Sequence, residues 1–261
     1  MSSKTITALL MCLIPWLLFC KGNVSQHKER PEPVSIAPEL HLPNHISGIT
    51  LSPGYIRSEY NNLSFAHWLR KVRLKKDNTV YLFDGSIKPN QQAQFAVLDI
   101  SVGKKNLQQC ADAAMRLRAE YLFHIKKYDA IHFTDNAGTV YQFSAPYTKE
   151  HLLKYLDKVF GMCGTASLAK QMKSIPIEDI QPGDVFVRGG FPGHAAIVMD
   201  VAINKDGKKN YLLAQSYMPA QDIHILKNPS NTDDNPWYSI TNDAFIKTPE
   251  YVFKQTELKR W

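Results

Sequence analysis

The segment from Gln181 to Val201, QPGDVFVRGGFPGHAAIVMDV, constrains the fold more than any other part of the chain. It begins with a Pro-Gly turn, continues as a short strand over 184–188, and then bends through several glycines. His194 follows the glycines and opens a run of small and branched apolar residues, which is typical of a buried strand. A histidine at that place is a candidate general base, and such a base needs a nucleophile elsewhere in the chain.

A β-hairpin is predicted after His194. The apolar run continues to Ile203, the turn residues Asn-Lys-Asp-Gly occupy 204–207, and a second apolar run returns over 211–214. Two such runs around a glycine-containing turn indicate neighbouring antiparallel strands. The residues just after the second run therefore come close to His194.

The register of this hairpin decides which polar residue meets His194. With Asn204 opposite Lys209, Gln215 falls on the face of His194, because side chains alternate along a strand. Ser216 then points to the other face, and a slip of one residue would exchange the two. Gln215 is therefore the predicted partner that fixes the tautomer and orientation of the imidazole, with Ser216 as the alternative.

A helix is predicted from Asn106 to about Lys127, with Cys110 in its first turn. Asn106 and Gln109 have the spacing of a capping box. The apolar stripe of this helix consists of Cys110, Ala113, Ala114, Leu117, Tyr121 and Ile125. Because the unpaired amides and the dipole at a helix N-terminus favour a thiolate, Cys110 is the candidate nucleophile. The side chains of Gln108 and Gln109, with the backbone amide of Cys110, are candidate donors to an oxyanion.

Four cysteines, at positions 12, 20, 110 and 163, leave two alternatives open. In an exported protein Cys110 and Cys163 can form a disulfide, which would give both a structural role. Cys163 also precedes a second helix start and is the rival nucleophile. The state of the Cys110 thiol distinguishes a nucleophile from a structural cysteine.

The first 20 residues read as a secretory signal peptide. Lys4 precedes an apolar run over 8–19 that is too short for a comfortable membrane span. The run ends at Leu-Leu-Phe-Cys, which resembles a bacterial lipoprotein signal in which Cys20 is the lipid anchor. Residues 21–45 contain four prolines among charged residues and read as a tether, so that one α+β domain is expected over 46–261. We therefore expect an exported protein, in the periplasm or anchored to a membrane of the cell envelope.

Charge and motifs exclude several classes of function. The formal net charge of +7 comes from basic residues that are spread along the chain, and no nucleic-acid-binding motif occurs. The sequence has no HExxH, and its cysteines have no CxxC spacing, so no metal site is expected. No phosphate loop or dinucleotide fingerprint appears, so no cofactor is expected either.

The residues around Cys110 and His194 resemble the papain-like superfamily, and within it the bacterial cell-wall peptidases of the NlpC type. The resemblance is carried by Pro182-Gly-Asp-Val-Phe186, by Gly193-His-Ala-Ala-Ile-Val198 and by the order helix, strand, strand, and it covers about 106–217. It implies a papain-like α+β core, with a helix that begins at the cysteine packed on an antiparallel sheet. It also implies a cysteine peptidase or amidase that cleaves an amide bond of cell-wall peptide.

Within this resemblance, Cys110 attacks the carbonyl, His194 transfers the proton and Gln215 orients His194. Tyr217 and Phe191 are expected to contact the substrate, and Arg116 can hold a substrate carboxylate. The runs over 107–113 and 116–121 also resemble a domain-of-unknown-function family of exported Bacteroidetes proteins.

A non-catalytic envelope module that binds glycan or peptide is the competing interpretation. In it, the exposed aromatic side chains of Phe191, Tyr217 and Trp237 would stack on sugar rings, and Cys110 would only pack or pair with Cys163. A reactive Cys110 thiol favours the enzyme, and an inert thiol or a disulfide favours the binding module.

Overall fold

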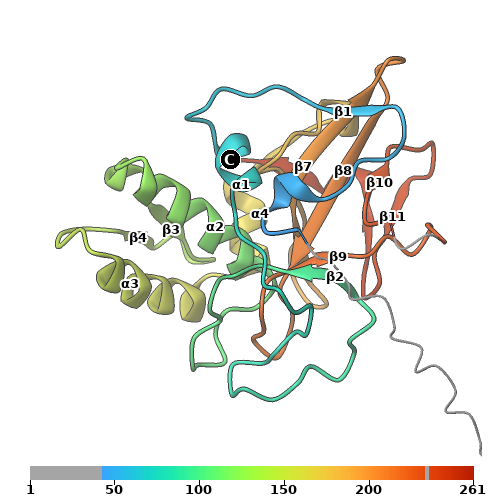
Figure 1. Cartoon of the computed structure of the whole chain (residues 1–261). Coiled ribbons are helices and arrows are strands. Elements are labelled where there is room, and N and C mark those ends of the chain that lie inside the picture. Colours follow the sequence, from blue (N-terminus) through green and yellow to red (C-terminus); the bar gives the residue numbers. More distant parts are fainter. Residues whose placement is uncertain (1–42, 233–234) are drawn as a thin grey trace, which may run out of the picture. The chain divides into compact units, whose positions relative to one another are not determined.

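A large antiparallel β-sheet organises the fold (Figure 1). The structure is a computed structural model that describes residues 43–232 and 235–261. Along the sheet the strands are β2 (Gln94–Val97), β9 (His224–Leu226), β8 (Lys209–Gln215), β7 (His194–Asn204), β6 (Val185–Arg188), β13 (Leu258–Arg260) and β5 (Lys173–Ser174). Two further strands, β1 (Tyr55–Arg57) and β10 (Tyr238–Ser239), pair with β7 and β8. The predicted signal peptide, Cys20 and most of the tether lie outside the described residues.

The helices gather beside this sheet (Figure 1), and in the described residues they are α1 (Phe65–Arg70), α2 (Cys110–His124), α3 (Lys149–Met162) and α4 (Thr165–Gln171). Two separate hairpins are formed by β3 (His132–Thr134) with β4 (Val140–Gln142) and by β11 (Phe245–Lys247) with β12 (Val252–Lys254). Short 3-10 turns occupy Ile46–Gly48, Tyr128–Ala130, Ile177–Asp179 and Gln255–Glu257. The chain is therefore a mixed α+β protein. In the part that the structure describes, no helix is both long and apolar enough to span a membrane.

Strand β7 is buried on both of its faces. Ala195 and Ile197 pack in the core cluster that contains the residues of α2, while Ala196 and Val198 pack in a second cluster with Phe186 and other residues of the opposite face. A strand covered on both faces can be apolar at nearly every position, which explains the continuous apolar run that follows His194. The start of β7 is thus packed in the core beside α2.

The register of the β7–β8 hairpin differs from the one assumed, yet Gln215 keeps its predicted face. Ile203, and not Asn204, lies opposite Lys209. An irregularity between Val198 and Asp200 then shifts the pairing by one more residue. Two shifts of one residue restore the original alternation, because the side-chain period of a strand is two.

Helix α2 begins later than predicted. Its N-cap is Gln109, whose backbone N–H donates to Asp112 Oδ2 at 2.8 Å, so the capping pair is Gln109 with Asp112 and not Asn106 with Gln109. Asn106 instead accepts a hydrogen bond from the backbone N–H of Ala220 at 2.8 Å. Cys110 is consequently the first residue of the helix, where unpaired backbone amides are concentrated.

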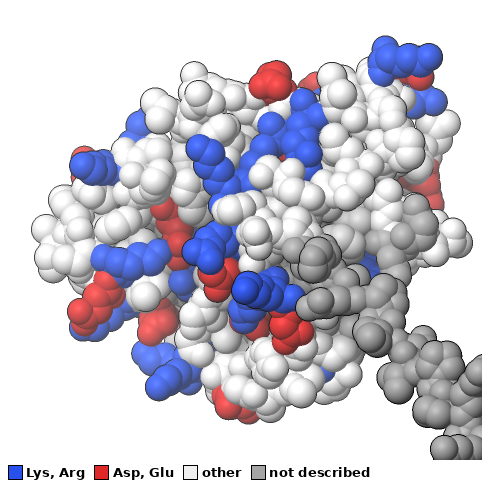
Figure 2. Space-filling model, viewed as in Figure 1, with Lys and Arg blue, Asp and Glu red and all other residues white. Residues whose placement is uncertain are grey.

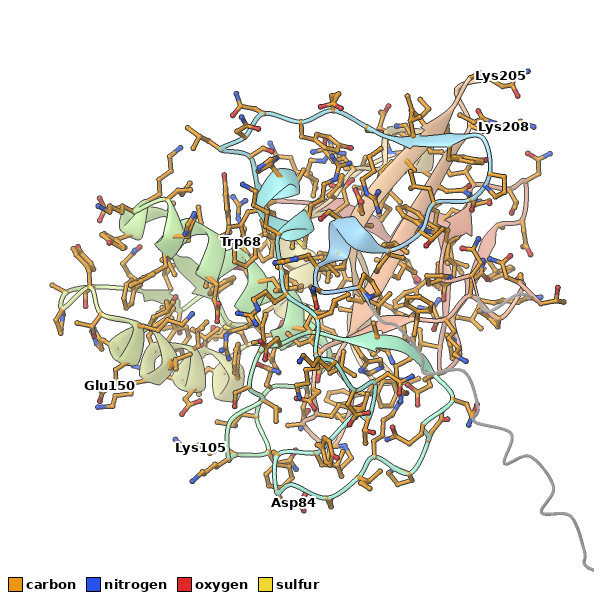
Figure 3. All side chains as sticks on the ribbon, viewed as in Figure 1. Trp68, Asp84, Lys105, Glu150, Lys205 and Lys208 are labelled. Carbon is orange, nitrogen blue, oxygen red and sulfur yellow. The ribbon has the colours of Figure 1, made fainter. Side chains whose placement is uncertain are left out.

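Charged side chains are interspersed on the face shown in Figure 2, where neither sign forms a single large field. Lys205 and Lys208 mark the tip of the β7–β8 hairpin, far along β7 from His194 (Figure 3). On this face the basic side chains are therefore dispersed, as the sequence pattern predicts.

Candidate active site

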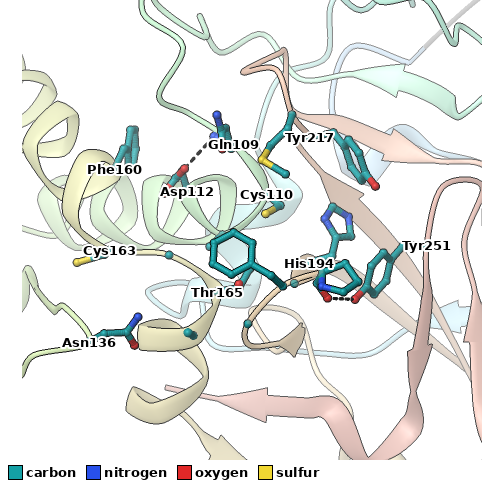
Figure 4. Close-up of a pocket in the computed structure, with 18 residues that line it drawn as sticks. Gln109, Cys110, Asp112, Asn136, Phe160, Cys163, Thr165, His194, Tyr217 and Tyr251 are labelled. Carbon is teal, nitrogen blue, oxygen red and sulfur yellow. Dashed lines mark hydrogen bonds between the residues drawn. The ribbon is translucent and has the colours of Figure 1, made fainter.

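A cavity of about 260 Å³ lies where α2 and β7 both begin (Figure 4). Cys110 and His194 line it together with Gln109, Phe191 and Tyr217. The nucleophile and base that the sequence predicts, about 80 residues apart in the chain, are therefore brought to one cavity.

The bend that brings His194 to this cavity requires a glycine at position 193. A Cβ at this position would lie 2.3 Å from the carbonyl oxygen of Gly190 and 2.4 Å from Thr165 Oγ1. Both distances are far below van der Waals contact, so the bend before His194 closes only around glycine. The glycine-rich run of the sequence thus sets the position of the first residue of β7.

The thiol of Cys110 is half-buried at the start of α2. Burial raises its pKa to about 11, and the negative charge of Asp112 adds to this rise. The backbone amides of Ala111, Cys110 and Ala195 interact with the thiol and oppose the rise. Because Ala195 directly follows His194, this interaction ties the thiol to the strand that carries the imidazole.

The imidazole of His194 is only 1% exposed and lies among aromatic rings. Its centroid is 4.7 Å from that of Tyr217, 4.9 Å from that of Tyr251 and 5.7 Å from that of Phe253. Burial lowers the pKa of His194 to about 4, with the hydrogen bond to Gln215 acting in the opposite direction. At neutral pH the imidazole is therefore uncharged and able to accept a proton.

Gln215 connects His194 to a half-buried carboxylate, that of Glu250. Gln215 Oε1 lies 2.8 Å from His194 Nε2, and Gln215 Nε2 donates to Glu250 Oε2 at 2.8 Å. Lys88 Nζ also donates to Glu250 Oε2 at 2.8 Å, and Asn90 Nδ2 donates to Glu250 Oε1 at 2.9 Å. The carboxylate accepts three donors and thereby fixes which end of the Gln215 amide faces it.

This chain of hydrogen bonds determines the tautomer of His194. Since Gln215 turns its oxygen to the imidazole, Nε2 must carry the proton, and the lone pair of the neutral ring is on Nδ1. Among the described residues, none forms a hydrogen bond with Nδ1. The nitrogen that can act as a base is therefore Nδ1, on a side chain that lines the cavity.

Glu250 and Lys88 were not found by sequence reasoning. Glu250 lies in the turn between β11 and β12, and Lys88 lies in an irregular segment before β2, at 4% exposure. Neither belongs to a motif, and the two are 162 residues apart, so no pattern in the sequence relates them. The Pro-Glu turn at 249–250 gives no signal beyond that of a loop.

The two candidate oxyanion donors have different positions. Gln109 lines the cavity, and its Nε2 donates to Asn106 Oδ1 at a long 3.3 Å. Gln108 does not line the cavity, because its side chain is buried and its Oε1 accepts from Arg116 Nη1 at 3.0 Å. Gln109 and the amides at the start of α2 are therefore the donors that can reach a reacting carbonyl.

Arg116 is buried away from the cavity, contrary to the expectation that it holds substrate. It forms an ion pair with Glu120 and donates to Gln108, because α2 is covered on nearly all sides. Ser216 is also buried elsewhere, with its hydroxyl donating to the carbonyl oxygens of Gln108 and Gln221.

Two of the three aromatic candidates lie at the cavity, and the third is buried elsewhere. Phe191 is fully exposed at the cavity, and Tyr217 is half-buried against His194. Trp237, expected to be exposed, is 1% exposed and donates its indole N–H to the carbonyl of Thr50 at 2.7 Å. The row of exposed aromatics required by the glycan-binding interpretation is thus incomplete.

Cys163 and Cys110 are both free thiols, so the disulfide alternative is wrong for this structure. Cys163 also lines the cavity, but it lies on the far side from His194 (Figure 4). Burial raises its pKa to about 11. Of the two thiols, Cys110 is therefore the one that lies on the side of His194. Within the described residues, no group of three or more His, Cys, Asp or Glu side chains is arranged to hold a metal ion.

Comparison with known families identifies one relationship. Residues 46–147 and 135–260 match the family described as Domain of unknown function (4846), DUF4846, and these matches together cover most of the chain. No curated protein and no solved structure matches the chain. On the extent of the family match, the protein belongs to the DUF4846 family.

Proposed function

We propose that the protein is an exported thiol hydrolase with a papain-like core that cleaves an amide or peptide bond, with cell-wall peptide as its substrate. The observation that carries this proposal is the hydrogen bond between His194 and Gln215, which leaves the lone pair on Nδ1 of an imidazole that lines the same cavity as Cys110. A structural histidine does not need a buried amide and carboxylate to select its tautomer.

In the proposed reaction, Cys110 Sγ forms a bond to the substrate carbonyl carbon as its proton passes to His194 Nδ1. The carbonyl oxygen becomes an oxyanion, which the backbone amide of Cys110 and the side chain of Gln109 stabilise. The intermediate breaks its carbon–nitrogen bond, and the leaving amine takes the proton from His194. Water, deprotonated by His194, then attacks the thioester, releases the acid and returns the proton to Cys110.

The electrostatics favour general-base catalysis over a preformed ion pair. The pKa of Cys110 is raised and that of His194 is lowered, so both groups are uncharged at neutral pH before substrate binds. The proton transfer then accompanies nucleophilic attack. The oxygen of the Gln215 amide accepts a hydrogen bond from the imidazolium that forms and thereby stabilises it.

The sequence resemblance alone supports three parts of this proposal. They are the cell wall as the source of substrate, the lipid anchor at Cys20 and the export of the chain. The cavity supports a small occupant near the thiol, since its volume of about 260 Å³ fits a few residues of a branched peptide and not a folded protein.

The proposal is tested by incubating the purified protein with soluble cell-wall peptides and following new amines and acids by mass spectrometry. Cleavage is expected for the wild type and is expected to vanish in Cys110→Ser and in His194→Ala, while Cys163→Ser retains it. Peptides that bind without being cut, in all four proteins, would support the binding module instead.

A further inference from the structure

Arg118 is the one arginine in the described part of the chain that has no carboxylate partner. It also donates no hydrogen bond to any described residue, although its side chain is half-buried. The fold therefore leaves a single guanidinium unpaired. Each of the other described arginines forms an ion pair: Arg57 and Arg70 with Asp200, Arg73 with Asp99, Arg116 with Glu120, Arg188 with Glu257, and Arg260 with Asp184.

Three aromatic rings surround the guanidinium of Arg118. Its Cζ lies 5.5 Å from the ring centroid of Phe65 and 5.8 Å from the centroids of Tyr121 and Trp261. Cation–π attraction stabilises the charge and orders the side chain, but it supplies no oxygen for the five N–H donors of the guanidinium. The guanidinium is therefore held in position and still lacks an acceptor.

Arg118 lines a cavity of about 240 Å³ that lies between α1, α2 and the turn that precedes β6. The apolar side chains in its lining are those of Phe65, Ala66, Pro182 and Trp261. A cavity of this size admits a small organic molecule and no folded partner. The unpaired guanidinium therefore borders a space that a small ligand can fill.

This cavity is separate from the candidate active site. The two linings share no residue. Arg118 lies eight residues after Cys110, which places it about 12 Å further along α2. A small ligand beside Arg118 therefore does not compete with a ligand at Cys110.

The other charges in this lining are matched within the protein. Asp184 is fully buried, and Arg260 donates to its Oδ1 at 2.7 Å through Nε and to its Oδ2 at 2.8 Å through Nη2. The backbone N–H of Gln181 also donates to Asp184 Oδ2 at 2.9 Å. Burial lowers the pKa of Arg118, whereas the hydrogen bonds with Asp184 raise the pKa of Arg260. Arg118 is therefore the charge in this lining that a ligand can meet without displacing a protein carboxylate.

We propose that this cavity binds a small organic carboxylate, with its oxygens on the guanidinium of Arg118 and its apolar body against Phe65 and Trp261. The planar fork of arginine matches the two oxygens of a carboxylate. The apolar lining favours a ligand with an apolar body over a bare anion such as phosphate. This binding function is additional to the proposed reaction and does not depend on it.

The test is an NMR titration of the purified protein with benzoate, benzamide and inorganic phosphate. Benzamide has the shape of benzoate without its charge, and phosphate has charge without an apolar body. The reporters are the signals of the Gly183 amide, the Arg118 Nε–H and the Trp261 indole N–H, because all three residues line the cavity.

We expect benzoate to bind with a Kd of about 1 mM or below, and at least about tenfold more tightly than benzamide or phosphate. Arg118→Gln should lose the preference for benzoate over benzamide. The matched control is Arg73→Gln, which changes the net charge equally at a side chain that is 75% exposed, and it should keep the preference.

Equal affinities of the wild type for benzoate and benzamide would overturn the proposal, as would tighter binding of phosphate than of benzoate. Benzoate-induced shifts that miss the three reporters would also overturn it. These results need only the wild-type protein, so they decide the question whether or not Arg118→Gln folds. A preference for benzoate that survives in a folded Arg118→Gln would contradict the role of the guanidinium. No peptide cleavage is measured, so failure of this proposal leaves the proposed function untouched.

Discussion

The two sides of the cavity differ in how completely their polar side chains are hydrogen-bonded. One wall carries His194, and the opposite wall carries Asp112 and Cys163. On the His194 wall, Gln215 bonds at both ends of its amide and Glu250 accepts three hydrogen bonds, while Nδ1 of His194 has no hydrogen-bond partner among the described residues. On the opposite wall, Asp112 has a buried oxygen that no described residue bonds, and the Cys163 thiol lies close enough to sense its charge. Hydrogen bonds fix the side chains of the first wall, and the second wall keeps a buried carboxyl oxygen without that stabilisation.

The largest expected effect is loss of the nucleophile. Cys110→Ser should lower kcat/KM for peptide cleavage at least about a thousandfold, because a serine hydroxyl beside an uncharged imidazole is a far weaker nucleophile than the thiol. The thermal unfolding midpoint should stay within a few degrees of the wild type. Cys163→Ser is the matched variant on the opposite wall, and a comparable loss of activity there would make Cys163 the nucleophile.

Breaking the hydrogen bonds of the His194 wall should affect both stability and activity. Glu250→Ala leaves Lys88 and the amide of Gln215 buried without their acceptor, which should cost about 3 kcal/mol of unfolding free energy in a denaturant titration. Freed from Glu250, the Gln215 amide can turn, so kcat should fall about tenfold or more while KM changes little. Removing Lys88 as well, in Lys88→Met with Glu250→Leu, should recover stability without recovering kcat.

Equal kcat values in the wild type and the stabilised double variant would show that the network is only structural. The tautomer argument would then be wrong, even if His194 remained essential.

The stability contributions of the two walls should change with pH in opposite directions. The folded-state pKa of His194 is about 4, below its usual 6.5, and burial gives the same value for His224 nearby. Each histidine therefore favours the folded state fully above pH 6.5, and this contribution to the unfolding free energy is lost as pH falls towards 4. The loss is up to about 3 kcal/mol for each histidine. Asp112 is the reverse case: because burial raises its pKa from 3.8 to about 8, the folded state loses stability as pH rises from 3.8 to about 8, and the loss is complete above that.

Urea unfolding from pH 4 to pH 9 separates these effects. The unfolding free energy of the wild type relative to Asp112→Asn should fall as pH rises from about 4 to 8 and stay constant above 8. A difference between the two proteins that does not change with pH would mean that Asp112 is not the group responsible.

The smallest effect is expected at the mouth of the cavity. Phe191 is fully exposed, so Phe191→Ala should leave the unfolding free energy within about 0.5 kcal/mol of the wild type. If the ring contacts substrate, KM should rise a few-fold with kcat unchanged. An unchanged KM would remove Phe191 from the substrate contacts and restrict recognition to the two walls.

Sequence reasoning could predict the site residues that lie in regular helices and strands. Cys110, His194 and Gln215 lie in regular elements with clear periodicity, so their placement depended only on a helix start and a hairpin. The assumed register was off by one residue, and the irregularity near Met199 compensated for it. A β-bulge has no dependable signal in a single sequence, so the correct face of Gln215 came partly from two shifts that cancelled.

The remaining parts of the site depend on contacts across the chain. Glu250 and Lys88 meet in irregular segments that no local pattern relates. Arg116 sat off the predicted apolar stripe, but α2 is packed on most sides and therefore buries it. The free oxygen of Asp112 was also hidden, because a carboxylate in the first turn of a helix is fully explained by capping until its second oxygen is located.

The central claim is that Nδ1 of His194 serves as the base for Cys110. The most direct measurement is the rate at which iodoacetamide alkylates Cys110 in the wild type and in His194→Ala, at pH values from 6 to 10, with the adduct mapped by mass spectrometry. We expect the variant to react about tenfold or more slowly at pH 7.5, and the difference to close as pH approaches 10 and hydroxide replaces the base. Rates that agree across the whole range, in a variant whose circular dichroism matches the wild type, would contradict the claim.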